Sequence, residues 1–396
     1  MRDFLLNDEM RAFRCEIRAL FQRELVPRCS DIERRSGWNA VMEVVQALGR
    51  GGYLRLLFRD LYDGPLTEPG LTAATILSEE AAYHNYGFES TVATTLSCAF
   101  PLYRFASASI RDRHLRPLIE GKSVGAICMT ERNVGSDSAG METIIRFDHS
   151  TSEWVINGFK RYISNASKAD VYVVWGISDP TVSPRKGMTA IVVPGDAPGL
   201  SFPQNYDFMG RRGCVVGEVS FDEVRVPEDN LLGRENEGFG IMLAAFNFER
   251  ILLGGSGLGV ARSAFDVAVA HAQQRSVFGQ KLGQKQLIWD MVAEMSWRLN
   301  AAELLTYRAS TMYDQGVDGV NLMGEASQAK LVSTEMAIFC ADRAVQILGG
   351  DGLTQQFGRT EQIYRDARAL TIVGGTSEMN KYLISSREMP TIKLNL

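Results

Sequence analysis

The sequence predicts an α+β protein with an N-terminal α-helical domain, a middle β-barrel or β-sandwich domain and a C-terminal four-helix bundle. Apolar residues recur three and four positions apart up to about residue 125. Short apolar runs separated by Gly and Pro follow, and helical spacing returns from about residue 237 in unusually long segments. We therefore place the domain boundaries at 1–125, 126–232 and 233–396.

The first domain is expected to be helical because segments such as MRAFRCEIRALFQREL, NAVMEVVQALGR and LTAATILSEEAAYH each carry one apolar face. The N-terminus is charged and lacks the uninterrupted apolar core of a signal peptide. We therefore expect a folded first helix and a cytoplasmic protein.

The middle domain is expected to consist of strands such as VGAICMT, ADVYVVWGIS, MTAIVVPG and GEVSFDEVRVP. The segment EWVINGFKRYIS is interpreted as two short strands joined by an Asn-Gly turn, which is a strong hairpin signal. The last domain contains three helical segments, each near or beyond the usual helix length. Helices of that length must pack along one another, so a bundle is predicted.

The composition is that of an ordinary globular protein, with 396 residues, 45% hydrophobic residues, 22% charged residues and a net charge of −5. This charge gives no indication of nucleic acid or an anionic membrane as a partner. No uninterrupted apolar run reaches the roughly 18 residues of a spanning helix. The six cysteines lack CxxC spacing and the four histidines lie far apart, so we expect neither a metal site nor a disulfide framework.

Seven motifs follow one another along the chain: CMTERNVGSDSAGMET, KRYISNAS, FDEVRVPEDNLLG, FNFER, QQRSVFGQKLGQKQL, QILGGDGL and YRDARALTIVGGTSE. Each motif alone is weak, but in this order and spacing they resemble the acyl-CoA dehydrogenase family over nearly the whole chain. The resemblance implies an FAD enzyme that oxidises the α–β bond of an acyl thioester to a trans double bond. It also implies a homotetramer or homodimer, with electron-transfer flavoprotein as the electron acceptor.

The resemblance implies two groups of FAD contacts. The first surrounds the flavin ring with backbone and hydroxyl donors, an aromatic ring and a polar loop: Met129, Thr130, Ser136, Tyr162 and Ser164. The second holds the pyrophosphate and adenosine side, in part from a neighbouring subunit: Arg275, Phe278, Gln286, Gln346, Gly349, Gly350, Thr376 and Glu378. Purely structural alternatives remain open, namely a β-turn at Ser136, a core aromatic at Tyr162 and helix capping at Thr376 and Glu378.

The implied chemistry needs a base for the α-proton. Most of the family places a glutamate just before the GT of the last motif, where this chain has Gly374. A minority, such as the isovaleryl-CoA and long-chain dehydrogenases, places it on the first long C-terminal helix, where this chain has Glu249. We therefore expect Glu249 to be the catalytic base, with burial raising its pKa and the Gly375 N–H polarising the thioester carbonyl. The alternative is that Glu249 forms an ordinary ion pair along its helix.

Four further residues are expected to bind substrate. Asn247 and Arg250 match positions that contact the pantetheine arm or order the helix, and Ser136 could touch the thioester arm as well as the cofactor. Glu89 stands where the glutaryl-CoA type has a carboxylate-binding arginine, which suggests that it recognises a hydroxyl or cationic group on the acyl chain. The alternative is that Glu89 turns away or pairs with Arg55 or Arg59.

Three other functions stay open at this stage. The substrate could be carried by acyl carrier protein rather than coenzyme A, as in a biosynthetic pathway. The same scaffold could reduce an enoyl thioester. The chain could also be a flavin-binding homologue without turnover.

Overall fold

The computed structural model describes residues 6–34, 37–61 and 66–392. Its N-terminal part is helical, and the predicted first helix begins where the Asn7 side chain accepts a hydrogen bond of 2.8 Å from the Met10 backbone N–H. The helices are α1 (Asp8–Glu24), α2 (Cys29–Ile32), α3 (Trp38–Arg50), α4 (Leu71–His84), α5 (Tyr86–Phe105), α6 (Ala108–Ile110) and α7 (Arg116–Ile119).

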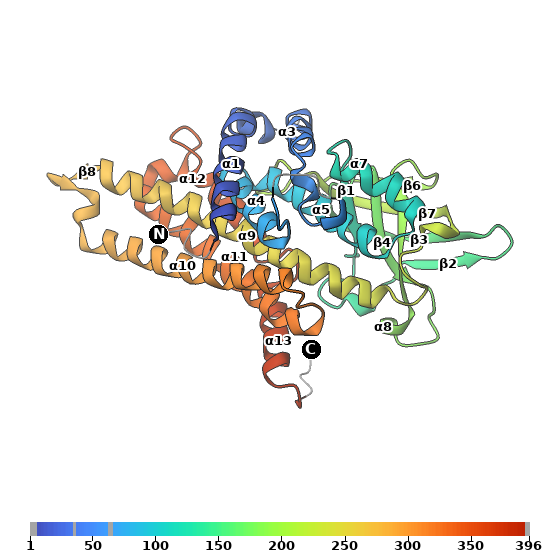
Figure 1. Cartoon of the computed structure of the whole chain (residues 1–396). Coiled ribbons are helices and arrows are strands. Elements are labelled where there is room, and N and C mark those ends of the chain that lie inside the picture. Colours follow the sequence, from blue (N-terminus) through green and yellow to red (C-terminus); the bar gives the residue numbers. More distant parts are fainter. Residues whose placement is uncertain (1–5, 35–36, 62–65, 393–396) are drawn as a thin grey trace.

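The middle part is a seven-stranded curled sheet in the order β1-β4-β2-β3-β7-β6, with β5 pairing on β4 (Figure 1). Strand β4 is buried along its whole length, as its continuous apolar sequence requires. The strands are β1 (Gly125–Cys128), β2 (Ile144–Asp148), β3 (Glu153–Ser164), β4 (Val171–Ile177), β5 (Met188–Pro194), β6 (Leu200–Ser201) and β7 (Val216–Pro227), with the short helix α8 (Pro184–Gly187).

The predicted hairpin at Asn157-Gly158 was wrong, because β3 runs through this dipeptide as one strand of 12 residues. The dipeptide instead forms an irregularity in the pairing of β3 with β7, between Ile156 and Gly158. There the Asn157 amide exchanges hydrogen bonds with Glu223, at 2.5 Å to its carboxylate and 2.9 Å from its backbone N–H. A side chain at Gly158 would also approach within 2.4 Å of the Thr143 hydroxyl. Close packing and a bulge therefore explain the Asn-Gly pair.

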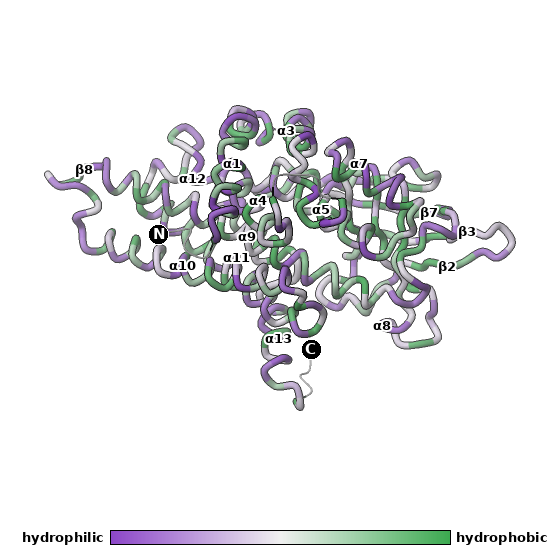
Figure 2. The backbone as a smooth tube through the Cα atoms, viewed as in Figure 1, coloured by the Kyte–Doolittle hydropathy of each residue, from purple (hydrophilic) through white to green (hydrophobic). Residues whose placement is uncertain are grey.

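The C-terminal part is helical, and its longest helix, α9, runs lengthwise through the molecule (Figure 1). Hydrophobic residues gather in the middle, where α5 and α9 pass, while the β8 tip is hydrophilic (Figure 2). By length and composition α9 is the one helix in the described part of the chain that could cross a membrane, yet 78% of its most apolar window is buried inside the protein. The elements are α9 (Gly238–Gln274), β8 (Ser276–Val277), β9 (Gln280–Lys281), α10 (Gln286–Asp314), α11 (Val320–Leu348), α12 (Thr360–Leu370) and α13 (Ser377–Glu388).

Two glycines explain why α9 and α4 pack so closely. A Cβ on Gly255 would lie 2.7 Å from the Thr75 carbonyl oxygen, and a Cβ on Gly259 would lie 2.2 Å from that of Glu79. Any larger residue would push the α4 backbone away. The GGSGLG run of α9 therefore fixes the N-terminal helices against the bundle.

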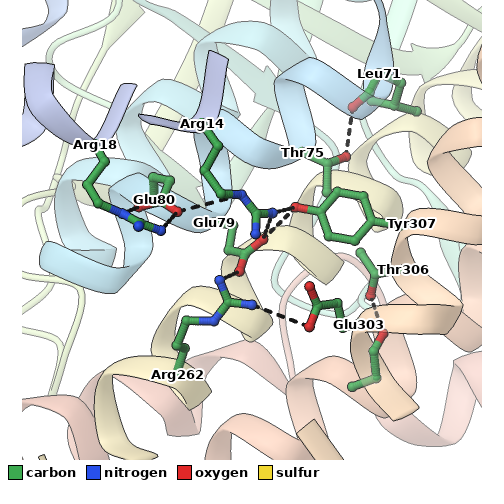
Figure 3. A network of polar contacts seen from close by, with 11 residues as sticks. Arg14, Arg18, Leu71, Thr75, Glu79, Glu80, Arg262, Glu303, Thr306 and Tyr307 are labelled. Atoms are coloured by element: carbon green, nitrogen blue, oxygen red, sulfur yellow. Dashed lines mark hydrogen bonds and ion pairs between the residues drawn. The ribbon is translucent and has the colours of Figure 1, made fainter. Parts of the chain in front are cut away.

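A buried polar network joins α1, α4, α9 and α10 (Figure 3). The Glu79 carboxylate accepts from Arg14 at 2.9 Å, from Arg262 at 2.5 Å and from the Tyr307 hydroxyl at 2.5 Å. Glu303 adds a longer contact of 3.5 Å to Arg262. Although burial opposes ionisation, the guanidiniums of Arg262 and Arg14 hold the pKa of Glu79 below its usual value. The network therefore carries charge, and the Glu79 carboxylate at its centre is the member on which the others converge.

Candidate active site

Helix α9 and the loop between α12 and α13 meet at Glu249 and Gly374. Gly374 has a positive φ of 65°, and a Cβ built on it would lie 3.8 Å from Glu249 Oε1. The same Cβ would lie 2.2 Å from Leu253 Cδ1, one helical turn beyond Glu249. The two positions that the resemblance implies for a base are therefore neighbours in this protein.

The environment of Glu249 suits a base. Its side chain is only partly exposed, and burial raises the pKa of its carboxyl above the usual value for glutamate. The cations Arg250, Arg211 and Lys330 act in the opposite direction. The Glu249 carboxyl is therefore partly accessible from outside the protein, and its ionised form is less favoured than that of an ordinary glutamate.

Arg250 and Asn247 form a buried polar pair beside Glu249. Burial lowers the pKa of Arg250 to about 10, opposed by the charge of Glu249. The Asn247 amide donates at 2.8 Å to the carbonyl of Gly319, the residue before α11, and Arg250 Nη1 lies 3.5 Å from Asn247 Oδ1. Asn247 thus fixes α9 against the start of α11. Arg250 also faces the glycine loop, since a Cβ on Gly375 would lie 4.0 Å from its Nη2.

The glycine loop is held by a lysine that sequence reasoning missed. Lys330 is fully buried, and its Nζ donates to the Gly375 carbonyl at 2.8 Å, beside the Asn380 amide at 2.9 Å. Burial, together with Arg250, lowers the pKa of Lys330 to about 8. Thr376 caps α13 by accepting from the Met379 N–H at 3.3 Å, while Glu378 is exposed in the first turn.

The residues predicted to surround the flavin ring lie where β1 ends and β3 ends. Tyr162 is 50% exposed and has a positive φ of 59°, so the alternative of a core aromatic is wrong. The preceding residue, Arg161, donates its backbone N–H to the Thr130 carbonyl at 3.0 Å and stacks its guanidinium over the Tyr162 ring. An exposed aromatic ring held in strained backbone fits a planar ligand stacked on it.

A buried ion pair fixes the Met129-Thr130 segment next to this ring. Lys160 is fully buried and donates at 3.1 Å to the Met129 carbonyl and at 2.7 Å to Glu131. Glu131 also accepts from the Thr143 hydroxyl and backbone N–H. Ser136 lies further along the same loop and is exposed. The segment is therefore preorganised without a ligand.

Ser164 contacts a second residue that sequence reasoning missed. Arg211 is 4% exposed, and its Nη2 donates to the Ser164 hydroxyl at 2.9 Å and to the Ser90 hydroxyl. The Arg211 backbone N–H donates to the carboxylate oxygen Oδ1 of Asp366 on α12 at 2.7 Å, which fixes the position of Arg211. Arg211 therefore places a positive charge between the sheet, α5 and the bundle.

Two members of the second group of predicted FAD contacts, Arg275 and Phe278, do not join the first group within one chain. Arg275 and Phe278 lie at the β8–β9 turn, and Figure 1 shows β8 and the sheet at opposite ends of the molecule. Phe278 is 95% exposed with a positive φ of 48°. Four other members of the group are also exposed at the ends of α10 and α11: Gln286, Gln346, Gly349 and Gly350.

Glu89 lies on α5, is 1% exposed and accepts a hydrogen bond of 2.8 Å from the Ser256 hydroxyl of α9. Arg59 donates instead to the carbonyls of Pro69 and Asp314. Pairing of Glu89 with Arg59 is therefore wrong, while the alternatives that it turns away from the substrate or pairs with Arg55 stay open.

Cysteines and metal ligands do not define another site. Four cysteines are buried, Cys29 is partly buried and Cys15 is exposed, so burial explains most but not all of them. Within residues 6–34, 37–61 and 66–392, no three His, Cys, Asp or Glu side chains gather as metal ligands.

Comparison with known proteins defines the class. Models of the acyl-CoA dehydrogenase N-terminal, middle and C-terminal domains match residues 7–122, 126–224 and 236–389. The short-chain specific acyl-CoA dehydrogenase of Megasphaera elsdenii is 30% identical over 379 residues, covering 95% of this chain and 97% of that protein. The acryloyl-CoA reductase (NADH) of Anaerotignum propionicum is 34% identical, covering 73% and 72% of the two chains. The solved structure of a glutaryl-coenzyme A dehydrogenase with glutaryl-CoA superposes with a TM-score of 0.92 at 27% identity, covering 100% and 98%.

The fold and the matched domains thus define an FAD-dependent oxidoreductase. This chain belongs to the acyl-CoA dehydrogenase family, with its helical, sheet and helical domains in the same order. The predicted family, three-domain fold and FAD cofactor are confirmed.

Proposed function

We propose that this protein dehydrogenates the α–β bond of an acyl-CoA thioester and that Glu249 removes the α-proton. The observation that carries the proposal is the meeting of Glu249 with Gly374, 3.8 Å from Oε1 to a Cβ at the glycine. Glu249 is the carboxylate at this junction, and its raised pKa suits proton transfer near neutral pH. An ordinary helical ion pair would hold the pKa low instead.

In the proposed reaction the Glu249 carboxylate takes the α-proton, and the Cα–Cβ bond becomes double as a hydride leaves the β-carbon. FAD, when bound, would supply the acceptor for that hydride. The chain's own contribution is to place the base and the donors. Lys330 and Asn380 donate to the Gly375 carbonyl and so fix the loop. In this proposal the Gly375 N–H would polarise the thioester carbonyl. The buried guanidinium of Arg250 adds positive charge beside the same loop.

The proposed FAD site combines two subunits. The flavin end would lie against Tyr162, Ser164 and the fixed Met129-Thr130 segment. The phosphate and adenosine end would receive Arg275 and Phe278 from a second copy, because these residues lie at the far end of their own chain (Figure 1). A homodimer or homotetramer is therefore part of the proposal, with Gln286, Gln346, Gly349, Gly350, Thr376 and Glu378 as further contacts and electron-transfer flavoprotein as the acceptor.

One second candidate has a specific observation behind it. The matched acryloyl-CoA reductase shows that a relative at 34% identity is named for the reverse direction. Glu249 in its protonated form could return a proton to the α-carbon of an enoyl thioester. The geometry favours neither direction, so the electron donor or acceptor decides between them.

The experiment is anaerobic titration of the purified flavoprotein with saturated acyl-CoA thioesters and with acyl carrier protein thioesters. Dehydrogenation predicts loss of the oxidised flavin absorbance with at least one substrate, together with a product lighter by two hydrogens. Bleaching by carrier protein thioesters alone would change the proposed carrier. Reoxidation of reduced enzyme by enoyl thioesters, without any bleaching by saturated ones, would establish the reductase.

A further inference from the structure

One face of α9 leads from the proposed base into the protein interior. Glu249, Leu253 and Ser256 are spaced by four and three residues, so they lie on the same side of the helix. Ser256 lies about 10 Å along the axis from Glu249, at about 1.5 Å per residue. The middle residue, Leu253, reaches the glycine loop at Gly374. This face therefore connects the proposed base with the buried Ser256 in the protein interior.

A buried carboxylate stands at the inner end of this face. Glu89 Oε1 accepts the Ser256 hydrogen bond at 2.8 Å, but Glu89 Oε2 has no hydrogen-bond partner within the described residues. The side chain is 1% exposed. Leaving a buried acceptor unsatisfied costs roughly 1–3 kcal/mol, and more if it is charged. The position is therefore unfavourable unless something else supplies a donor.

The neighbouring cation does not supply that donor. Arg211 acts on Glu89 through its charge, but its guanidinium donates to the Ser90 and Ser164 hydroxyls, and its Nε has no partner in the described part of the chain. Burial raises the pKa of Glu89 to about 7, against the opposing influence of the Ser256 and Ser78 hydroxyls and of Arg211. Glu89 therefore lacks a committed counter-ion.

We infer that Glu89 is a specificity residue whose free carboxylate oxygen accepts a hydrogen bond from an amine or hydroxyl on the acyl group, beyond its β-carbon. The inference rests on the proposed function, since it takes Glu249 to mark the α-carbon. A purely alkyl chain would complete the desolvation of Glu89 without satisfying Oε2. A donor satisfies it, and an ammonium adds charge pairing, so the amine is favoured over the hydroxyl.

The test compares acyl-CoA thioesters of equal length that end in a methyl, a hydroxyl or an ammonium group, over chain lengths from butanoyl to octanoyl. Binding is measured by perturbation of the flavin spectrum in Glu249→Gln, so that turnover does not interfere. Glu89→Gln and Glu89→Leu are added to this background. Glu303→Gln serves as the matched control because it changes another buried glutamate, in the network of Figure 3.

The expected result is that the best donor-bearing thioester binds about 10- to 100-fold more tightly than its methyl counterpart. Glu89→Leu should reverse this preference, Glu89→Gln should remove the advantage of ammonium over hydroxyl, and Glu303→Gln should change neither. The inference would be overturned if the methyl-ended thioesters bound most tightly and this preference were unchanged in both Glu89 variants. Bleaching of the wild-type flavin by an acyl thioester would still support the proposed dehydrogenase function in that case. Absence of binding by every thioester would overturn the proposed function and the inference together. If Glu89→Leu fails to fold, the isosteric Glu89→Gln decides.

Discussion

A Cβ on Gly374 would lie 3.8 Å from Glu249 Oε1, so the two residues share one small volume at the end of α12. An acid at either position would therefore reach the same volume. Glycine at 374 also tolerates the φ of 65°, which an L-residue rarely adopts. Gly374 in the loop therefore leaves this volume to the glutamate at position 249 of the helix.

Replacing Gly374 with alanine is expected to displace the base. The new Cβ would meet Leu253 Cδ1 at 2.2 Å and would strain the backbone at its positive φ. We expect the rate of flavin bleaching by acyl thioester to fall about 10- to 100-fold, because small misplacements of catalytic groups have effects of this size. The control is Gly240→Ala, at an exposed helical glycine with no atom within 4 Å of the added Cβ. Equal rates in the two variants would contradict the shared volume.

The bleaching rate should depend on the ionisation of Glu249. Burial raises its pKa in the folded protein, and only the carboxylate can accept a proton. The rate should therefore rise with pH through a midpoint above the ordinary glutamate value of about 4.3. Because the pKa of Glu249 is higher in the folded than in the unfolded protein, any contribution of this residue to stability is present at low pH. That contribution declines as pH rises through the folded-state midpoint. A bleaching rate independent of pH would argue against a glutamate base.

Removing the buried cation at Lys330 should shift that midpoint. Lys330 lowers the pKa of Glu249 by its charge, so Lys330→Met is expected to move the midpoint to higher pH. It should also loosen the loop by removing the 2.8 Å hydrogen bond to the Gly375 carbonyl. Lys122→Met is the control, since that side chain is 72% exposed. A lower overall rate with an unmoved midpoint would show that Lys330 acts only on the structure of the loop.

The network around Glu79 should stabilise the whole fold. Glu79→Gln would leave Arg14 and Arg262 without their buried partner, and breaking such a pair costs about 3–5 kcal/mol. Because the pKa of Glu79 is lowered, its contribution is present at neutral pH and lost as pH falls below the ordinary glutamate range. Thermal unfolding should show a large drop in Tm, whereas Glu43→Gln, at an exposed surface pair, should change little. Equal Tm values for both variants would contradict this account.

Much of the fold could be predicted because its signals are local. The period of apolar residues changes near residue 126 and again near 237, and the structure changes from helix to sheet and back at these places. The predicted Asn157-Gly158 turn was wrong for a tertiary reason. Glu223 on β7 and Thr143, just before β2, contact this dipeptide and make it a strand irregularity. Local propensity could not reveal those partners.

The candidate site was predictable only in part. Glu249 and the glycine loop could be predicted from the sequence motifs. The motifs did not show that the two lie next to each other, which only the structure shows. Lys330 and Arg211 come from separate segments and meet the site only through tertiary packing. A lysine between Ala329 and Leu331 in a buried helical face was the one available signal, because such a residue must find a polar partner.

The central claim is that Glu249 is the base, and rapid anaerobic mixing of Glu249→Gln with the best thioester tests it most directly. Glutamine keeps the shape of the side chain but cannot accept the α-proton, so bleaching should slow by at least about 100-fold, the lower end for general base catalysis. Flavin content and thioester binding should remain as in the wild type, and Glu303→Gln should bleach normally. Bleaching of Glu249→Gln at the wild-type rate would contradict the account and place the base elsewhere.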